Sequence, residues 1–407
     1  MSDRAPATAI VLAPDWPAGD NGYGIALASS LEAYQRVFDS VIYIAITSRP
    51  RPAGIEAATG VEWVHVPIRT LPQWARFGAS LLTRHPATCF RYHQEEAAVL
   101  SVVLERLSAA EKAPYIIIED IPLAAYAELI RARHPEVAIA IRSHDVMTKA
   151  YGPLKFTGGL LRRLSWRIEM SRIERTERTC FDTADAVWAI TQVDSDTYAT
   201  LLGGRTAGVV GAHIDTRRYA TVPTVTSRTL VHVGSADLRK GIGLRRFVDE
   251  SWPLVRAAVP DARFIVAGRN TETLTNESQG VSGLGYVSDD LLILAQGSVF
   301  INPQPFGSGL QLKSIVAMAA GRALVSTETG IEGIDGTDGV HFLKFSTPQD
   351  AATAVIKCLT IPALAHSIGK SGQSLAVARF SSSVVSADSA ATIERLVSRG
   401  LRAHRNK

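Results

Sequence analysis

The chain has 407 residues, more than one hydrophobic core usually serves, so its length predicts two domains of roughly 200 residues each. Hydrophobic residues make up 46% and charged residues 20% of the sequence, a balance that excludes a disordered or fibrous protein. The formal net charge of +4 favours phosphate-bearing partners but is too small to indicate nucleic acid binding.

Two features bear on the cellular compartment and on metals. The first apolar run, residues 9–13, is far too short for a signal-peptide core or a membrane span. The three cysteines are odd in number and far apart, which argues against a disulfide framework and a paired-cysteine zinc site, and the ten histidines show no ligand spacing. We therefore expect a cytoplasmic protein that needs no metal and no cofactor.

The first half alternates short β-branched runs with helical stretches. Strands are expected near residues 10, 43, 64, 117, 140 and 188. Strands that alternate with helices predict a parallel sheet, and their continuous apolar cores indicate that helices cover both faces.

A second series of strands is expected near residues 232, 265, 300, 324 and 342. The Thr- and Pro-rich stretch 221–228 has no helical period and is the expected linker. We therefore predict an α/β protein of two doubly wound, Rossmann-like domains, residues 1–220 and 221–385, that face each other across a cleft. Ligands in such sheets bind beyond the carboxyl ends of the strands. The last helical stretch, within residues 386–407, is expected to pack back onto the first domain.

The strongest functional signal runs from Phe300 to Gly321. It predicts a buried strand, a Pro- and Gly-rich turn and a helix that opens near Gly309. This arrangement suits an anion, because glycines let backbone amides approach a ligand and a helix start carries unpaired N–H groups. Lys313, one turn into the helix, adds a full charge. Alone, the same pattern also fits a purely structural turn.

A second basic loop is expected at a strand end of the same domain. The segment TLVHVGSADLRKGIGL places Gly234 at the end of a strand, and Arg239 and Lys240 before a helix. Two basic loops at strand ends fit a diphosphate clamp, in which lysine or arginine neutralises a leaving diphosphate without a metal.

The order of these motifs resembles glycosyltransferase family 4 and its GT-B relatives over most of the chain. GSADLRKG is similar to the family's G-R-x-x-x-x-K-G loop, which implies that Lys240 is the phosphate-binding lysine. Ser235 stands where the family has arginine, and we expect Arg239 to compensate. Lys313 matches the lysine of the family's variant pattern G-x-G-x-x-x-K.

The resemblance also implies contacts to the nucleotide. VAGRN and LGYVSDD, residues 266–270 and 284–290, resemble the two loops that enclose the base. The residues expected at the donor are Gly234, Ser235, Arg239, Lys240, Arg269, Tyr286, Val287, Gly307, Ser308, Gly309, Leu310, Lys313 and Glu332.

The family's paired glutamates, which hold the donor's sugar and ribose, are absent. Residues 303–305, Pro-Gln-Pro, occupy the region of the first, and Val316 stands at the second. We therefore expect ribose recognition to differ from that of the family and to use Glu328 or Glu332. The sequence does not decide between a UDP-sugar and a GDP-sugar donor.

In the first domain, PDWPAGDNGYGIALASSL resembles the family's glycine loop, where acceptor and donor phosphate meet. It is not a dinucleotide fingerprint, because Leu27 stands where a third glycine would be. Asp20 also fits a turn-forming role. The residues expected at the acceptor are Asp20, Gly22, Tyr23, Gly24 and Arg142.

AIAIRSHDVM places His144 and Asp145 after a buried strand. A lone histidine is more often structural, but the family often has a strand-end histidine there beside the donor sugar, which implies that His144 orients the transferred sugar. Asp145 fits either the base of an inverting reaction or a helix cap. The D-x-D-like triplet at 194–196 opens a helix, where aspartates are expected caps, so we predict no metal there.

Between Lys155 and Arg178, seven basic residues stand against three acidic ones, with leucines and isoleucines near helical spacing. The run fits a membrane-surface helix or an interior-facing helix with a solvated basic side. We predict the second, since apolar stripes at helical period usually face a core. Together with the stretch 69–86, this run is also compatible with a protein that binds peripherally to an anionic membrane surface.

The sequence thus predicts a retaining, metal-independent hexosyltransferase that moves a sugar from a UDP- or GDP-sugar to a glycan or lipid-linked glycan. Lys240 and Lys313 would stabilise the leaving diphosphate. Two alternatives stay open. One is an inverting GT-B enzyme with Asp145 as base. The other is a catalytically silent GT-B partner in polysaccharide assembly, which the absent glutamates favour and the intact lysines oppose.

Overall fold

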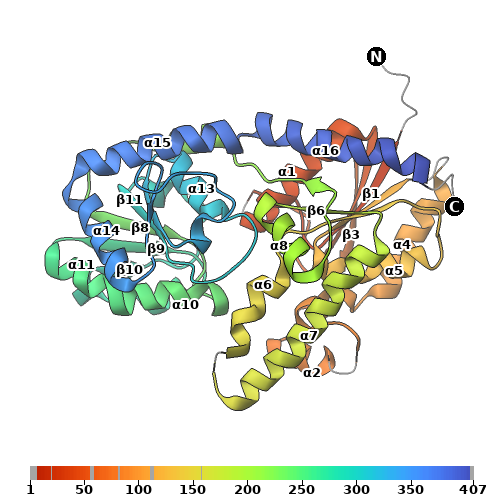
Figure 1. The fold of residues 1–407 in the computed structure, drawn as a ribbon, viewed down its shortest axis with the longest axis horizontal. Coiled ribbons are helices and arrows are strands. Elements are labelled where there is room, and N and C mark those ends of the chain that lie inside the picture. The colour runs from red at the N-terminus through yellow and green to blue at the C-terminus, as the bar shows by residue number, and fades with distance from the viewer. Residues whose placement is uncertain are drawn as a thin grey trace. The chain divides into compact units, whose positions relative to one another are not determined.

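The computed structural model describes residues 7–19, 21–55, 59–80, 83–110, 114–156 and 158–403. The chain divides into two compact units, Met1–Ala212 with Val385–Lys407, and His213–Val384 (Figure 1). Within the described residues, each unit is built on one parallel sheet with helices packed against it.

The sheet of the first unit has the order β3-β2-β1-β4-β5-β6-β7, with every described pair of strands parallel. Its strands are β1 (Thr8–Ala13), β2 (Ser40–Thr47), β3 (Val61–Pro67), β4 (Tyr115–Glu119), β5 (Ile139–Arg142), β6 (Ala186–Ala189) and β7 (Gly208–Val209). The chain winds outward from β1 to β3 and then returns to β4 on the other side of β1. In a doubly wound sheet this reversal opens a crevice at the carboxyl ends of the two strands.

Helices connect these strands and bury an apolar core on each face of the sheet. They are α1 (Gly22–Val37), α2 (Gln73–Ser80), α3 (Ala87–Phe90), η2 (Arg91–His93), α4 (Glu96–Ala109), η3 (Ile121–Leu123), α5 (Ala125–Arg131), α6 (Met147–Tyr151), η4 (Gly152–Phe156), α7 (Leu160–Thr183) and α8 (Gln192–Leu202). The final helix, α16 (Ser382–Ala403), contributes Ile393 and Val397 to one of these cores.

The sheet of the second unit has the order β10-β9-β8-β11-β12-β13 and is also parallel. Its strands are β8 (Thr229–Val233), β9 (Arg263–Ala267), β10 (Val281–Gly283), β11 (Val299–Asn302), β12 (Ala323–Ser326) and β13 (Leu343–Lys344). Here the order reverses between β8 and β11, so the loops that follow these two strands flank the crevice.

The helical segments of this unit surround a core formed by the sheet and the helices after β8 and β13. They are α9 (Thr216–Ala220), α10 (Leu238–Arg246), η5 (Phe247–Ser251), α11 (Trp252–Ala258), η6 (Thr271–Leu274), η7 (Glu277–Gln279), α12 (Leu291–Leu294), α13 (Leu312–Ala319), η8 (Thr329–Ile331), α14 (Pro348–Thr360) and α15 (Pro362–Phe380). Among the described helices none is alone long and apolar enough to cross a membrane, and the bent pair α14 and α15 passes that test only jointly.

The predicted fold class is confirmed, and every strand expected from the sequence is present. The interior-facing prediction for the basic run is wrong for the first turns of α7. Leu160 and Leu161 are each 82% exposed, whereas Ile173, further along the helix, is fully buried. Figure 1 shows why: the amino-terminal turns of α7 extend beyond the body of the unit, and its later turns pack on the core.

Candidate active site

The loop after β1 turns tightly into α1. The Oδ1 atom of Asn21 caps the helix by accepting hydrogen bonds from the amides of Tyr23 at 3.0 Å and Gly24 at 2.9 Å. A Cβ atom on Gly24 would lie 2.0 Å from the carbonyl oxygen of Ala18, so only glycine lets the loop fold so closely onto the helix. Asp20 lies outside the described residues. This geometry places the side chain of Tyr23 at the reversal of the strand order.

Asp120 follows β4 and holds the neighbouring loops together. Its Oδ2 atom accepts a hydrogen bond of 2.7 Å from the hydroxyl of Tyr23, and its Oδ1 atom accepts from the amides of Ile121 at 2.9 Å and His144 at 3.2 Å. Its backbone has φ 81° and ψ 147°, which is costly for a residue with a side chain. Backbone strain of this kind concentrates at functional sites, where the surrounding contacts enforce it.

A buried triad of hydrogen-bonded side chains lies next to this loop. The Oε2 atom of Glu119 lies 3.0 Å from Nη1 of Arg142 and 2.7 Å from Nε2 of His144, and its Oε1 atom accepts from the hydroxyl of Tyr34 at 2.7 Å. Burial alone would raise the pKa of Glu119, but the charge of Arg142 and the hydrogen bond from His144 outweigh it and lower the pKa to about 2. The carboxylate is therefore charged at neutral pH.

These contacts settle how His144 is held. Because Glu119 only accepts, Nε2 of His144 carries a proton and donates it, and Nη1 of Arg142 shares the same carboxylate oxygen. The ring of His144 lies against that of Tyr23, with centroids 4.8 Å apart, and the residue is 6% exposed. His144 is thus fixed in one tautomer and one orientation at the carboxyl end of the sheet.

The site residues predicted in the first unit, for the acceptor and for catalysis, are only partly brought together. Tyr23 and His144 are adjacent, but Arg142 is fully buried and its guanidinium also donates to the carbonyls of Val210 and Gly211, at 2.8 Å each. We therefore reassign Arg142 from acceptor binding to the positioning of Glu119. Asp145 precedes the cap of α6, which is Val146, so it is not the helix cap that the sequence left open.

Sequence reasoning missed Glu119 and Asp120. The signal was present, since two acidic residues directly follow the apolar strand run YIII, where a parallel sheet places its ligands.

In the second unit, the loops after β8 and β9 and the start of α13 converge. A Cβ atom on Gly234 would lie 3.4 Å from Nζ of Lys313, so this ammonium stands next to the bare backbone of the β8 loop. Gly268, with φ 139°, packs so closely that an added Cβ atom would lie 2.3 Å from the carbonyl oxygen of Gly234. The amide of Ala236 donates to the carbonyl of Arg269 at 2.9 Å, which joins the two loops.

His232 adds an acceptor to the same place and was not predicted. Its Nδ1 atom lies 2.7 Å from the carbonyl oxygen of Ile301, so Nδ1 carries the proton and Nε2 presents a lone pair beside Gly234. Burial, together with the charge of Lys313, lowers the pKa of His232 to about 3. The imidazole is therefore neutral at pH 7 and leaves Lys313 as the local cation.

The turn between β11 and α13 differs in one respect from its prediction. The helix opens at Leu312, not near Gly309, which has φ 76° and belongs to the turn. Gly307 and Leu310 lie in the same turn, where Ser308 is buried. Lys313 is the second residue of the helix, so its charge lies at the helix end that favours anions.

The remaining predicted donor residues fall into three groups. The side chains of Arg239 and Lys240 lie outside the described part of the structure, so the proposed phosphate role of Lys240 stays a prediction. Tyr286 is 64% exposed and Arg269 is also exposed, as residues available to a ligand must be, and Val287 is half-buried. Ser235, in the β8 loop, is half-buried too.

The two carboxylates considered for ribose recognition are placed differently. Glu328 pairs with Lys344 at 2.7 Å, whereas Glu332 directly follows η8 and is half-buried. Val316, at the position of the family's second glutamate, is buried inside the unit.

Comparison with known proteins agrees with this geometry. Residues 227–360 match the family model of the glycosyl transferases group 1. No curated protein matches the chain. Among solved structures, sucrose-phosphate synthase from Thermosynechococcus elongatus is 16% identical with a TM-score of 0.71, and the match covers 97% of this chain and 100% of that one.

Two further structures show the same fold. HepE of Anabaena, in complex with UDP and glucose, is 15% identical with a TM-score of 0.66, and the match covers 95% of this chain and 100% of that one. The α,α-trehalose 6-phosphate synthase from Burkholderia multivorans is 13% identical with a TM-score of 0.65, with 99% of each chain covered. Identities this low establish the fold alone.

The family match and the fold together define the chain as a glycosyltransferase of the GT-B fold. Its second unit carries the domain of the glycosyl transferases group 1, within residues 227–360.

Proposed function

We propose that this chain transfers a hexosyl group from a UDP- or GDP-sugar to a glycan or a lipid-linked glycan. The second unit would bind the donor and the first unit the acceptor. The relatives with the same fold include a protein solved with UDP-glucose, which supports a nucleotide-sugar donor without identifying the sugar.

The observation that carries the proposal is the position of Lys313. Its ammonium lies beside Gly234, where the backbone has no side chain to keep a ligand away, and the lysine stands in the first turn of α13. A leaving diphosphate there meets a full positive charge at the start of a helix, which is the electrostatic stabilisation that glycosyl transfer requires. Because lysine supplies this charge, the proposed transfer step uses no metal ion.

His144 has a different role in the proposed reaction. Its ring is locked by Glu119 and Tyr23, so it can orient a bound sugar without itself reorganising. No nucleophilic carboxylate is required if the donor phosphate deprotonates the acceptor on the same face of the sugar, which is the retaining course we propose.

A thermal-shift screen against UDP, GDP, ADP, TDP and CMP tests the donor proposal, because a ligand that binds the native state raises its melting temperature by mass action. We expect UDP or GDP to stabilise the protein at millimolar concentration. If none of the five nucleotides shifts the melting temperature, the transferase proposal is wrong. That result would favour the alternative of a catalytically silent partner in polysaccharide assembly. NMR of the product's anomeric proton then separates retention from inversion.

We further propose that the first turns of α7 lie on an anionic membrane surface, which favours a lipid-linked acceptor. Leu160, Leu161 and Leu164 are exposed beside Arg162, Arg163 and Arg167, and Phe156 in η4 is 64% exposed. Apolar side chains with adjacent arginines fit the interface of anionic lipids, where burial and charge attraction add.

Liposome flotation tests this surface. We expect the chain to float with vesicles that contain anionic lipid and not with zwitterionic vesicles. Replacing Leu160 and Leu161 by serine should abolish flotation and leave the nucleotide-induced thermal shift unchanged. Equal flotation of the variant and the original chain would contradict the proposed surface.

A further inference from the structure

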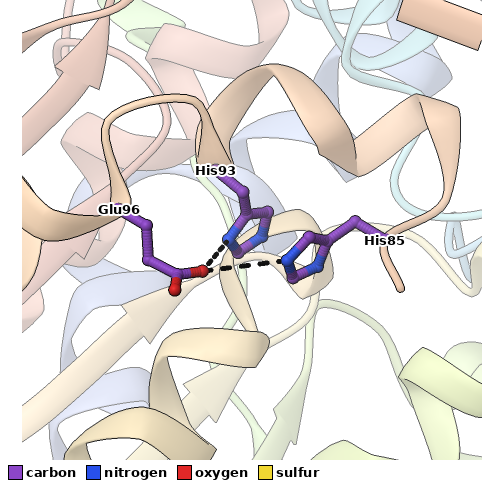
Figure 2. A group of neighbouring side chains, drawn as sticks. All are labelled: His85, His93 and Glu96. Carbon is purple, nitrogen blue, oxygen red and sulfur yellow. Dashed lines mark ion pairs between the residues drawn. The ribbon is translucent and has the colours of Figure 1, made fainter. Parts of the chain in front are cut away.

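Two histidines and a glutamate form a separate cluster in the first unit (Figure 2). His85 precedes α3, His93 ends η2 and Glu96 begins α4. The Nε2 atom of His85 and the Nδ1 atom of His93 each lie 3.7 Å from Oε2 of Glu96. The three atoms all lie within 4.8 Å of one another, close enough to surround one ion.

His93 presents an unpartnered nitrogen to this cluster. Its Nε2 atom lies 2.9 Å from the carbonyl oxygen of Pro122, so in the neutral ring Nε2 carries the proton and Nδ1 presents a lone pair. The side chain is 2% exposed, and Nδ1 has no hydrogen-bond partner. A buried lone pair that faces a carboxylate oxygen is unfavourable, and a cation between the two satisfies both.

The other two groups complete a donor set for a metal ion. His85 offers its Nε2 atom at the same point, 3.7 Å from Oε2 of Glu96. Two imidazole nitrogens and one carboxylate oxygen are a donor set that Zn²⁺ and related ions accept, with a fourth position left for water. A ligating histidine usually donates its other N–H to a carbonyl or carboxylate, as His93 does to Pro122.

We propose that His85, His93 and Glu96 bind one borderline divalent transition-metal ion, of which Zn²⁺ is the type. The ion would sit behind Pro122, two residues after Asp120, and would tie α4 and η2 to the loop that carries Asp120. It would support this loop and take no part in the transfer step. The inference rests on the cluster alone and does not depend on the proposed donor.

Metal binding requires one local change. The rings of His85 and His93 are stacked, with centroids 3.9 Å apart and planes 3° apart. Because each lone pair lies in its own ring plane, the rings must tilt apart to point at one ion. His85 lies in a non-helical segment and is the ring that can turn, whereas His93 is held by Pro122 and by stacking on Tyr126.

The two arginines near the cluster are each engaged with other groups. Arg84 is paired with Glu128 at 2.9 Å. Arg172 donates to the carbonyls of Ser80 and Thr83 at 2.6 Å each. Both guanidinium groups are therefore held by acceptors of their own.

Titration calorimetry with ZnCl₂ on the metal-stripped full chain tests the proposal. We expect one equivalent to bind, and the Co²⁺ form to show the visible absorption of a tetrahedral site. His93→Ala and Glu96→Gln should each weaken the affinity by more than about 100-fold, because a lost ligand costs more than a lost outer-shell contact. Glu96→Gln keeps the shape of a half-buried side chain, so it reports on binding even if His93→Ala unfolds.

The matched control is His134→Ala. His134 lies 3.1 Å from Glu136 at the surface of the same unit, but among the described residues no second imidazole joins that pair. This variant should bind Zn²⁺ as the original chain does. The proposal is overturned if the original chain binds less than one equivalent, or if Glu96→Gln and a folded His93→Ala bind as tightly as the control.

Discussion

Glu119, the last residue of β4, and His144, in the loop after β5, are joined by a hydrogen bond of 2.7 Å in the interior of the first unit. Arg142 lies on the same carboxylate oxygen at 3.0 Å. A buried carboxylate is tolerated only when it is paired and hydrogen-bonded, so the three residues are stable as a set and each depends on the others.

Glu119→Gln should therefore lower the free energy of unfolding by about 3 kcal/mol, because it leaves the charge of Arg142 buried without its partner. Urea unfolding followed by circular dichroism measures the change. Glu128→Gln is the matched control: it breaks the exposed pair with Arg84 and should cost less than about 1 kcal/mol. Equal losses of unfolding free energy in the two variants would show that the buried triad contributes no more to stability than an exposed ion pair.

The same carboxylate predicts a pH dependence of stability. The pKa of Glu119 is lowered from 4.5 to about 2, so the folded state binds this proton less tightly than the unfolded state. Its stabilisation is fully present above about pH 5 and is lost as the pH falls toward 2. The difference in melting temperature between the original chain and Glu119→Gln should be constant from pH 7 to 5 and shrink below pH 4. A difference that grows on acidification would contradict the assignment.

The fold was predictable from the sequence because strand runs such as YIIIE are apolar throughout and alternate with helical stretches. Candidate site residues could be named from the sequence only where neighbouring residues in the chain indicate a ligand, as at Lys313, which follows a glycine-rich turn. The burial of Arg142 could not be read from the sequence, because it depends on contacts to Val210 and Gly211, about seventy residues away. Arg142 was therefore wrongly assigned to the acceptor. The exposure of Leu160 was missed for a similar reason, since helical spacing does not reveal how far α7 extends beyond the core.

Asp120→Gly should destabilise the first unit less than Asp120→Ala. Both substitutions remove the carboxylate that accepts from Tyr23 and His144. Glycine adopts φ 81° without strain, whereas alanine keeps the cost of this conformation, so the difference should be about 1 kcal/mol in favour of glycine. Urea unfolding of the two variants side by side gives this number. If alanine is the more stable variant, the backbone at residue 120 is not strained.

Lys313→Ala should weaken the binding of UDP or GDP by more than about tenfold and leave the binding of the nucleoside unchanged, because a charge-assisted contact to phosphate is worth at least 1.5 kcal/mol. Calorimetry with each nucleotide and its nucleoside measures both affinities. Lys370→Ala, which removes an exposed lysine of α15 in the same unit, controls for the loss of a positive charge. Parallel loss of nucleotide and nucleoside would refute the phosphate role of Lys313.

Gly24→Ala should shift the loop after β1 and so test whether its close packing holds Tyr23 against Asp120. The added methyl group would lie 2.0 Å from the carbonyl oxygen of Ala18, which is backbone and cannot rotate away, so we expect a loss of about 1–3 kcal/mol. Gly19→Ala is the control within the same loop, because an added Cβ atom there meets nothing within 4 Å. If the loop only connects two elements, Gly24→Ala will lower stability but leave turnover intact. If it presents Tyr23 to the acceptor, turnover will fall as well, and Gly19→Ala will change neither.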